Sequence, residues 1–468
     1  MDYNRPLNAS KDNPKVDIAL LMVPGRNHTK SGKYSKSPLL LNPGGPGGSG
    51  VFFALFGGSI LQQVVGLDQD IIGFDPRGIG ETTPVADCFA FPSGGKDKEL
   101  TGADISRGFF HKFLWALSGQ ETGLVNTSAD SLEKIDVRER AAAKLCQTKD
   151  ALYGEDSILR HVSTPAVARD MLSILDAWDA WMEAKEEDDN NKGNVEIESL
   201  EAVEEDKSLD TKGKLVYWGF SYGTLLGATF AAMFPDRVGR VILDGVVDAD
   251  YYVGPVLEES LLDTDKVMAS FFYFCHKAGK KCALYRDGDS ELDVQARFEQ
   301  VNEKLKKNPI KGVNPQSLTP TVFTHDFLKI FIFQLIYSPI MTFPIMAQIL
   351  DMLHRGDEAT LLSIFASGNA ANQDIFCSNQ IFSGYEGRDA QLAIMCSDKR
   401  YPVSHLLPPH ISSKMLAYTP IAQRIDSQPA SALRQNGATV LLRRRLDDPH
   451  DRLRLLVYPR HRPTHALG

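Results

Sequence analysis

The chain has 468 residues, of which 43% are hydrophobic, so it can bury one or two globular cores. Its formal net charge of −9 does not favour a nucleic-acid or anionic-membrane partner. Much of the negative charge lies in one acidic run, residues 183–210, which we interpret as a solvated loop.

Apolar strands alternate with helical segments through the first half of the chain. The expected strands are residues 15–24, 37–42, 69–75, 214–221 and 237–248, and the expected helices are residues 163–182 and 224–234. Because these strands are apolar on both faces, the pattern predicts a mostly parallel sheet covered by helices on both sides.

Residues 247–423 show helical patterns without a strong strand signal, which predicts a helical insertion between strands. Its longest apolar stretch, residues 330–350, contains Pro339 and Pro344. We therefore expect two helices broken near the prolines and not a membrane span. Residues 437–443 and 452–458 have the pattern of two final strands.

The segment WGFSYG places Ser221 between Gly219 and Gly223, after an apolar strand and before a helix. A nucleophilic serine on a tight strand-to-helix turn needs small residues at these two positions. The context predicts that Ser221 is a nucleophile and that the backbone N–H of Tyr222 helps to stabilise an oxyanion.

A second oxyanion donor must come from another loop, and residues 42–50 (NPGGPGGSG) offer one after an apolar strand. Glycines let backbone N–H groups approach a developing negative charge, so we expect the donor in this loop. No Lys-Ser or Lys-Thr pair follows the loop, which argues against a phosphate-binding loop.

With these motifs the chain resembles the tripeptidyl-aminopeptidase and prolyl-aminopeptidase branch of the α/β-hydrolase superfamily. The matching segments are residues 39–50, 70–80, 164–171, 215–248 and 394–398, and the resemblance extends from residue 15 to about residue 400. The resemblance implies an α/β-hydrolase fold, with a mostly parallel sheet flanked by helices and a helical cap inserted after the sixth strand. The core would comprise residues 1–246 and the atypical C-terminal end, 424–468, with the cap at 247–423.

The resemblance also implies roles for several other residues. A glycine N–H in Gly44 to Gly47, with Gly44 and Gly45 as the first candidates, would be the second oxyanion donor. Asp75 and Arg77 in the DPRG turn would brace the loop beside the site. Two disulfides are implied, Cys88 with Cys146 and Cys275 with Cys282, whereas Cys396 of the CSD motif would need a later cysteine that this sequence does not contain.

A catalytic serine needs a histidine base and a carboxylate that orients it, in the chain order Ser, acid, His for this fold. Our first choice is Asp448 with His465; His461 and Asp244 are the alternative base and acid. Only eighteen residues separate Asp447 from His465, which leaves no room for the usual intervening helix. One hypothesis is that residues 424–468, rich in arginine and without lysine, are a mispredicted end of the gene.

The resemblance implies a serine hydrolase that forms an acyl-enzyme and releases short peptides or single residues from N-termini. An esterase or lactonase of a small metabolite is the alternative, as is a non-catalytic protein that binds a ligand and lacks a competent base. An exopeptidase would need cap carboxylates for the substrate ammonium, for which Glu258, Glu259 and Asp263 are candidates. We expect a peptide or small acyl substrate, no metal and no organic cofactor.

The compartment is predicted only indirectly. Three glycosylation sequons, at Asn8, Asn27 and Asn126, an even cysteine count and the resemblance favour secretion. The opening residues MDYNRPLNAS, however, have no signal-peptide pattern, so either the protein is intracellular or its first segment is missing.

Overall fold

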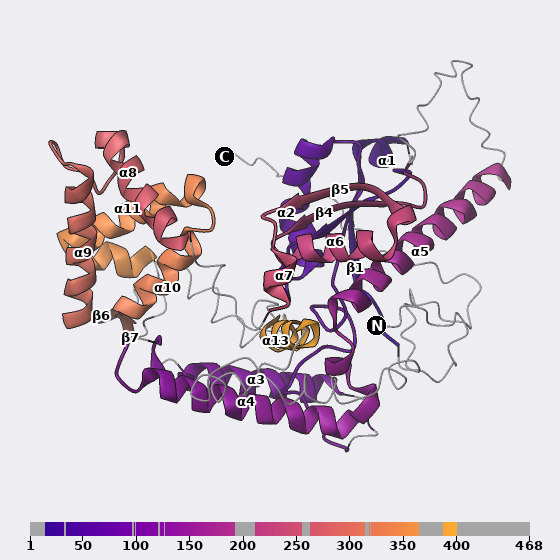
Figure 1. The fold of residues 1–468 in the computed structure, drawn as a ribbon, viewed down its shortest axis with the longest axis horizontal. Helices are drawn as coiled ribbons and strands as arrows, with labels where there is room; N and C mark the ends of the chain where they lie inside the picture. Colours follow the sequence, from indigo (N-terminus) through magenta and orange to yellow (C-terminus); the bar gives the residue numbers. More distant parts are fainter. Residues whose placement is uncertain are drawn as a thin grey trace, which may run out of the picture. The chain divides into compact units, whose positions relative to one another are not determined.

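The computed structural model describes residues 15–31, 34–95, 98, 100–119, 122–125, 127–191, 211–254, 263–313, 318, 320–364 and 387–399. The chain forms two compact units (Figure 1). Unit 1 comprises Met1–Ala116, Asp136–Pro255 and Ser383–Gly468, and unit 2 comprises Leu117–Ile135 and Val256–Phe382. Each unit has its own buried apolar residues.

Unit 1 contains a five-stranded sheet in the order β1-β3-β2-β4-β5. The strands are β1 (Leu20–Val23), β2 (Leu39–Asn42), β3 (Ile71–Phe74), β4 (Leu215–Phe220) and β5 (Val238–Asp244). Only β1 runs antiparallel to its neighbour, and β3, β2, β4 and β5 are parallel. The expected mostly parallel sheet is thus confirmed, with the carboxyl ends of β2 and β4 at the same edge.

Helices cover both faces of this sheet because successive apolar side chains of its strands point to opposite sides. Leu39 and Leu41 of β2 pack with Ala54 of α2, whereas Leu40 packs in the core that includes residues of α5 and α6. The helices of unit 1 are α1 (Arg26–Ser31), α2 (Gly50–Val65), α3 (Gly102–Gly119), α4 (Ser131–Tyr153), α5 (Thr164–Asn191), α6 (Tyr222–Met233), α7 (Ala249–Tyr252) and α13 (Gly387–Asp398), of which α3 and α4 each cross a unit boundary.

Two parts of unit 1 differ from the sequence prediction. Helix α5 continues to Asn191, so the first part of the acidic run is helical and not a loop, as its alanine, glutamate and lysine residues permit. Helix α13, which we had placed within the cap, groups with unit 1, and its Ala390, Ala393 and Ile394 are buried in the same core as strand β4.

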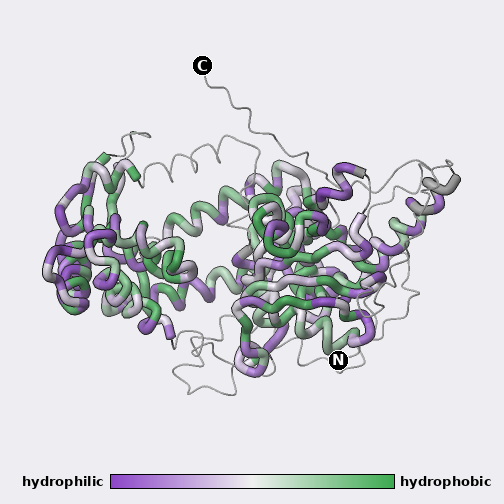
Figure 2. The backbone as a smooth tube through the Cα atoms, turned by 90° about the horizontal axis from the view of Figure 1, so that it is seen from above, coloured by the Kyte–Doolittle hydropathy of each residue, from purple (hydrophilic) through white to green (hydrophobic). Residues whose placement is uncertain are grey.

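Unit 2 is mainly helical. It holds α8 (Thr264–Ala278), α9 (Glu291–Lys307), α10 (His325–Leu335) and α11 (Pro339–Arg355), with a short antiparallel pair, β6 (Ile310–Val313) and β7 (Pro320–Phe323), that we had not expected. Hydrophilic and hydrophobic residues alternate along its helices (Figure 2). We expected the cap after a sixth strand, but among the described residues the segment Val256–Phe382 of unit 2 follows β5, the fifth strand.

The apolar stretch of residues 330–350 is divided between α10 and α11, and Pro339 is the first residue of α11. A proline fits this first helical position because no intrahelical hydrogen bond needs its nitrogen. The predicted break is confirmed at Pro339, whereas Pro344 lies inside α11 and does not end it. No helix among the described residues is long and apolar enough to span a bilayer.

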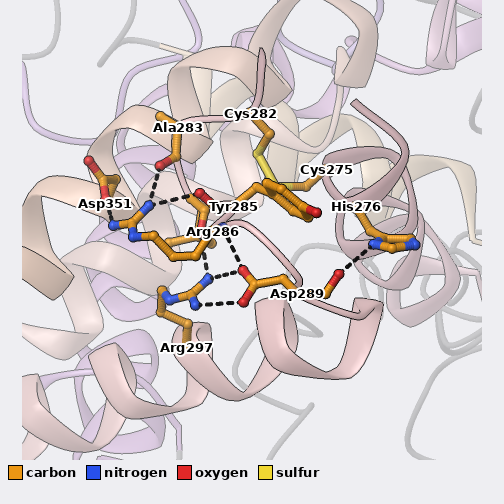
Figure 3. The surroundings of a disulfide bond; sticks show 10 residues. Cys275, His276, Cys282, Ala283, Tyr285, Arg286, Asp289, Arg297 and Asp351 are labelled. Carbon is orange, nitrogen blue, oxygen red and sulfur yellow. Dashed lines mark hydrogen bonds and ion pairs between the residues drawn. A yellow bond between two sulfur atoms is a disulfide. The ribbon is translucent and has the colours of Figure 1, made fainter. Parts of the chain in front are cut away.

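Both expected disulfides are present. Cys88 is bonded to Cys146 in unit 1 and Cys275 to Cys282 in unit 2. Figure 3 shows the second disulfide beside two ion pairs, one joining Arg297 to Asp289 (2.8 Å) and the other joining Arg286 to Asp351. In a small helical unit these polar contacts and the disulfide tie the loop after α8 to α9 and α11.

Among the described residues, short 3₁₀ turns lie at Gly154–Asp156, Ile158–Arg160 and Pro235–Arg237 in unit 1 and at Gly279–Lys281 in unit 2. Among the described residues Cys396 has no disulfide partner. Of the three sequons, Asn27 is exposed in α1, and Asn8 and Asn126 lie outside the described residues.

Candidate active site

Ser221 lies on the turn between β4 and α6, as the sequence predicts. Its backbone has φ 53° and ψ −124°, a conformation that non-glycine residues rarely adopt and that costs about 1–3 kcal/mol. Hydrogen bonds on both sides hold it there: Ser221 N–H donates to the carbonyl of Asp244 (2.9 Å), and the Thr224 hydroxyl donates to the Ser221 carbonyl (2.6 Å). The serine itself is exposed.

The spacing of the two glycines follows from the tightness of this turn. A Cβ on Gly219 would lie 2.4 Å from the Gly223 carbonyl oxygen, and a Cβ on Gly223 would lie 2.8 Å from the Asn42 carbonyl oxygen. Both distances are too short for any side chain. The turn therefore brings β4, α6 and the end of β2 into backbone contact.

The glycine loop after β2 lies directly against the serine turn. A Cβ on Gly44 would be 2.3 Å from the Phe220 carbonyl oxygen and 2.9 Å from Tyr222 N, and the φ of Gly44 is +88°. The N–H of Gly44 donates to the Asn42 side chain (2.9 Å). For the N–H groups of Gly45 and Tyr222 the described residues provide no acceptor.

Asp75 braces the start of the helix that follows this loop. Its buried carboxylate accepts hydrogen bonds from the Ser49 hydroxyl (2.6 Å), Val51 N–H (3.0 Å) and Glu81 N–H (2.9 Å). Burial raises the pKa of Asp75, and these three hydrogen bonds oppose that shift. This agrees with the structural role implied by the family resemblance.

Arg77 extends the brace to α5. Its guanidinium makes two hydrogen bonds to the Asp170 carboxylate and a third to the His161 carbonyl (3.0 Å). Both partners of the ion pair are buried. Arg77 therefore fixes the DPRG turn against a helix on the face of the sheet opposite to α2.

The predicted acid and base cannot be located relative to Ser221, because they lie outside the described residues. Asp448, His461 and His465 lie outside the described residues. Asp244 ends β5 opposite Phe220, with an exposed side chain, and its carbonyl accepts the Ser221 N–H. No histidine among the described residues is hydrogen-bonded to Ser221.

Sequence reasoning missed a carboxylate that approaches the serine turn from another side. Asp398, the last residue of α13, accepts hydrogen bonds from Thr164 and from the hydroxyl of Tyr252. Thr164 in turn contacts the hydroxyl of Tyr222, the residue after the predicted nucleophile. Asp398 belongs to the CSD motif, in which the sequence analysis assigned a role only to Cys396.

The three cap carboxylates proposed to bind a substrate ammonium gain no support from the described residues. Glu258 and Glu259 lie outside the described residues. Asp263 is exposed and pairs with Lys266 one turn along α8 (2.6 Å), a common surface ion pair. The described residues also contain no group of three His, Cys, Asp or Glu side chains suited to a metal ion.

Known proteins resemble the chain both locally and over most of its length. A family model for the alpha/beta hydrolase fold matches residues 198–288, which include the serine turn. "Tripeptidyl aminopeptidase" of Streptomyces lividans is 24% identical over 409 residues, covering 86% of this chain and 60% of the relative. "Serine protease Hip1" of Mycobacterium tuberculosis is 25% identical over 403 residues, covering 85% and 62%.

A shorter match joins the chain to "Carboxylesterase B" of Mycobacterium tuberculosis, which is 33% identical over 89 residues, 19% of this chain and 15% of the relative. The chain spans about three fifths of the length of the tripeptidyl aminopeptidase and Hip1 relatives. Together with the sheet order and flanking helices, these matches confirm the α/β-hydrolase fold and the predicted resemblance to the tripeptidyl aminopeptidases.

Proposed function

We propose that this chain, which has the α/β-hydrolase fold, is a serine hydrolase whose nucleophile is Ser221. The observation that carries the proposal is the strained backbone of Ser221, exposed at the carboxyl end of β4 and held by hydrogen bonds on both sides. Strain of this kind persists where the surrounding structure over-determines it, typically at functional sites.

The oxyanion that forms after attack would be stabilised by the N–H groups of Tyr222 and Gly45. Tyr222 begins α6, so its N–H is one of the first four that an α-helix leaves unpaired. Gly45 is favoured over Gly44 because the Gly44 N–H already donates to Asn42. Such a pair of fixed donors is typically the largest electrostatic contribution to acyl transfer.

In the proposed reaction the Ser221 hydroxyl oxygen bonds to the acyl carbon while its proton passes to a histidine. The histidine then protonates the leaving amine or alcohol, and water releases the acyl group by the same route. We keep His465 and Asp448 as the proposed base and acid, with His461 and Asp244 as alternatives. Asp244 gains support from its place beside the serine turn.

For the substrate we propose an N-terminal peptide or amino-acid unit of an unblocked chain. The support is the similarity to a tripeptidyl aminopeptidase and a serine protease over some 85% of this chain. The match to a carboxylesterase covers only 19% of this chain and carries the alternative, an esterase of a small acyl compound.

Labelling of the purified chain by a fluorophosphonate probe tests the nucleophile. We expect labelling on Ser221, with Ser221→Ala unlabelled and Ser270→Ala, a serine of α8 in unit 2, still labelled. A folded wild-type chain that does not label would refute the serine hydrolase and favour a non-catalytic ligand-binding protein.

Peptide reporters then separate the two substrate classes. An aminopeptidase should release a chromophore from a tripeptidyl amide and lose this activity when the amine is acetylated. An esterase should hydrolyse short acyl esters, and its activity on an aminoacyl ester should not depend on whether the amine is free or acetylated.

A further inference from the structure

A polar cluster, buried except for one partly buried carboxylate, joins four helix ends of unit 1. We define the Asp398 cluster as Thr164, the first residue of α5; Tyr222, the first of α6; Tyr252, the last of α7; and Asp398, the last of α13. The side chains of Tyr222 and Tyr252 are buried, and their rings lie 5.6 Å apart. The reaction proposed above uses only the backbone of Tyr222 and leaves the cluster unexplained.

The hydrogen bonds of the cluster have a defined direction. The Thr164 N–H donates to Oδ1 of Asp398 (2.8 Å), and the Thr164 hydroxyl donates to Oδ2 (2.6 Å). A threonine hydroxyl has one proton, so the Thr164 oxygen must accept the hydrogen bond from the Tyr222 hydroxyl. The Asp398 carboxylate thus orients Thr164, and Thr164 orients the phenol of Tyr222.

We propose that Asp398 is a positioning residue that fixes Tyr222 at the serine turn through the hydroxyl of Thr164. The inference rests on the proposed function, because the backbone N–H of Tyr222 is the donor that would stabilise the oxyanion. A misplacement of about 1 Å at a reacting centre can slow catalysis on the order of a hundredfold. Anchoring the phenol at one end of this residue restricts the N–H at the other.

Charge in the cluster agrees with this role. The N-terminus of the long helix α5 and the ammonium of Lys399 both favour the ionised carboxylate. Lys399 also donates to the carbonyls of Tyr252 (2.7 Å) and Gly254 (2.6 Å). Burial nevertheless raises the pKa of Asp398 to about 6, so at neutral pH the group is an acceptor, as the bond directions require.

We call the hydrogen bonds from Tyr222 to Thr164 and from Thr164 to Asp398 the relay. Matched variants of the relay test the positioning role in the fluorophosphonate reaction. Thr164→Val removes the hydroxyl at nearly constant volume, and Thr164→Ser keeps it; Asp398→Asn replaces an acceptor by a donor. We expect the maximal labelling rate to fall about tenfold in Thr164→Val and Asp398→Asn, with the half-saturating probe concentration changed less than twofold. Thr164→Ser should remain within twofold of the wild type.

Asp70→Asn is the control for a merely structural effect. Asp70 is fully buried whereas Asp398 is only partly buried, and Asp70 precedes β3 at the opposite end of the strand, where it accepts from the N–H groups of Gly25 and Ser35 (both 2.7 Å). We expect this variant to lower the unfolding midpoint without slowing the labelling of Ser221. Wild-type labelling rates in both Thr164→Val and Asp398→Asn would overturn the inference.

A double-mutant cycle on urea unfolding decides the anchoring without any chemistry at Ser221. If Thr164 transmits the effect, Tyr222→Phe and Asp398→Asn together shift the unfolding midpoint by less than the sum of their separate shifts. Additive shifts would overturn the inference even if the protein labels normally. A wild-type chain that does not label would refute the proposed hydrolase, whereas a non-additive cycle would still support the anchoring of Tyr222.

Discussion

The ionisation of Asp398 should make the stability of unit 1 fall as pH rises through the weakly acidic range. Burial raises the pKa of this carboxyl to about 6 from its ordinary 3.8, against the opposing effect of its hydrogen bonds from Thr164. The stabilisation from a raised carboxyl pKa is complete below the unfolded-state value of 3.8 and is lost as pH rises through about 6. Above that pH the folded chain holds an ionised, partly buried carboxylate.

The size of the effect follows from the two pKa values. At 1.36 kcal/mol for each pH unit, the difference between 3.8 and about 6 corresponds to about 3 kcal/mol. Asp398→Asn does not titrate, so the unfolding free energy of wild type minus that of the variant should fall by up to about 3 kcal/mol between pH 4 and pH 7. The comparison with the variant cancels the titration of groups common to both proteins.

Urea unfolding followed by tryptophan fluorescence measures this difference. All four tryptophans belong to unit 1, namely Trp115, Trp178, Trp181 and Trp218, so the signal reports the unit that contains the cluster. Parallel stability curves for wild type and Asp398→Asn from pH 4 to pH 7 would refute the reasoning, because they would mean that the carboxyl titrates alike in the folded and unfolded chains.

Three further predictions concern the neighbouring parts of the fold. Gly44→Ala should abolish labelling of Ser221, because its Cβ would meet the Phe220 carbonyl oxygen at 2.3 Å; labelling at the wild-type rate would mean that this loop does not contact the turn. Arg77→Met should lower the unfolding free energy by about 3 kcal/mol, since it leaves Asp170 as an unpaired buried charge, and urea unfolding would show it. Cys275→Ser with Cys282→Ser should destabilise unit 2 by about 2 kcal/mol, as expected for a seven-residue loop, and leave Ser221 labelling unchanged; limited proteolysis within α8 and α9 measures the first effect and the probe the second.

Features that depend on neighbouring residues could be predicted from the sequence. The apolar runs identified all five described strands of unit 1, and the glycine spacing around Ser221 identified the turn, because sterics at residues 219 and 223 decide it locally. The two disulfides came from the family resemblance and are present. The strands and the turn need little knowledge of distant parts of the chain, whereas the pairing of Cys88 with Cys146, 58 residues apart, came from the resemblance alone.

Features that depend on tertiary neighbours could not be predicted. The sequence offered Gly44 and Gly45 equally as oxyanion donors, and only the bond from Gly44 to the Asn42 side chain separates them. Asp398 lies 234 residues from Thr164, and nothing in the CSD motif indicates which helix its carboxylate meets. The sequence prediction extends the cap to residue 423, whereas Ala390, Ala393 and Ile394 of α13 are buried in the core of unit 1.

These long-range contacts also explain how the strained serine turn is maintained. A conformation that costs about 1–3 kcal/mol persists only if several independent contacts are lost when it relaxes. The Ser221 N–H is held by the end of β5, its carbonyl by Thr224, and the same threonine hydroxyl accepts from Val247 N–H (2.9 Å). On the side of the serine turn that faces β2, the backbone of Gly44 packs against Phe220 and Tyr222.

The Asp398 cluster would add the only one of these restraints that depends on pH. The restraints from β5, Thr224 and Gly44 act through backbone groups and one neutral hydroxyl, whereas the relay through Thr164 requires an ionised carboxylate. If the relay matters, a fall of pH below about 6 should slow labelling of Ser221 in the wild type more than in Asp398→Asn, whose relay is already broken. Equal slowing in both proteins would assign the whole pH dependence to the catalytic base and leave Asp398 with a purely structural role.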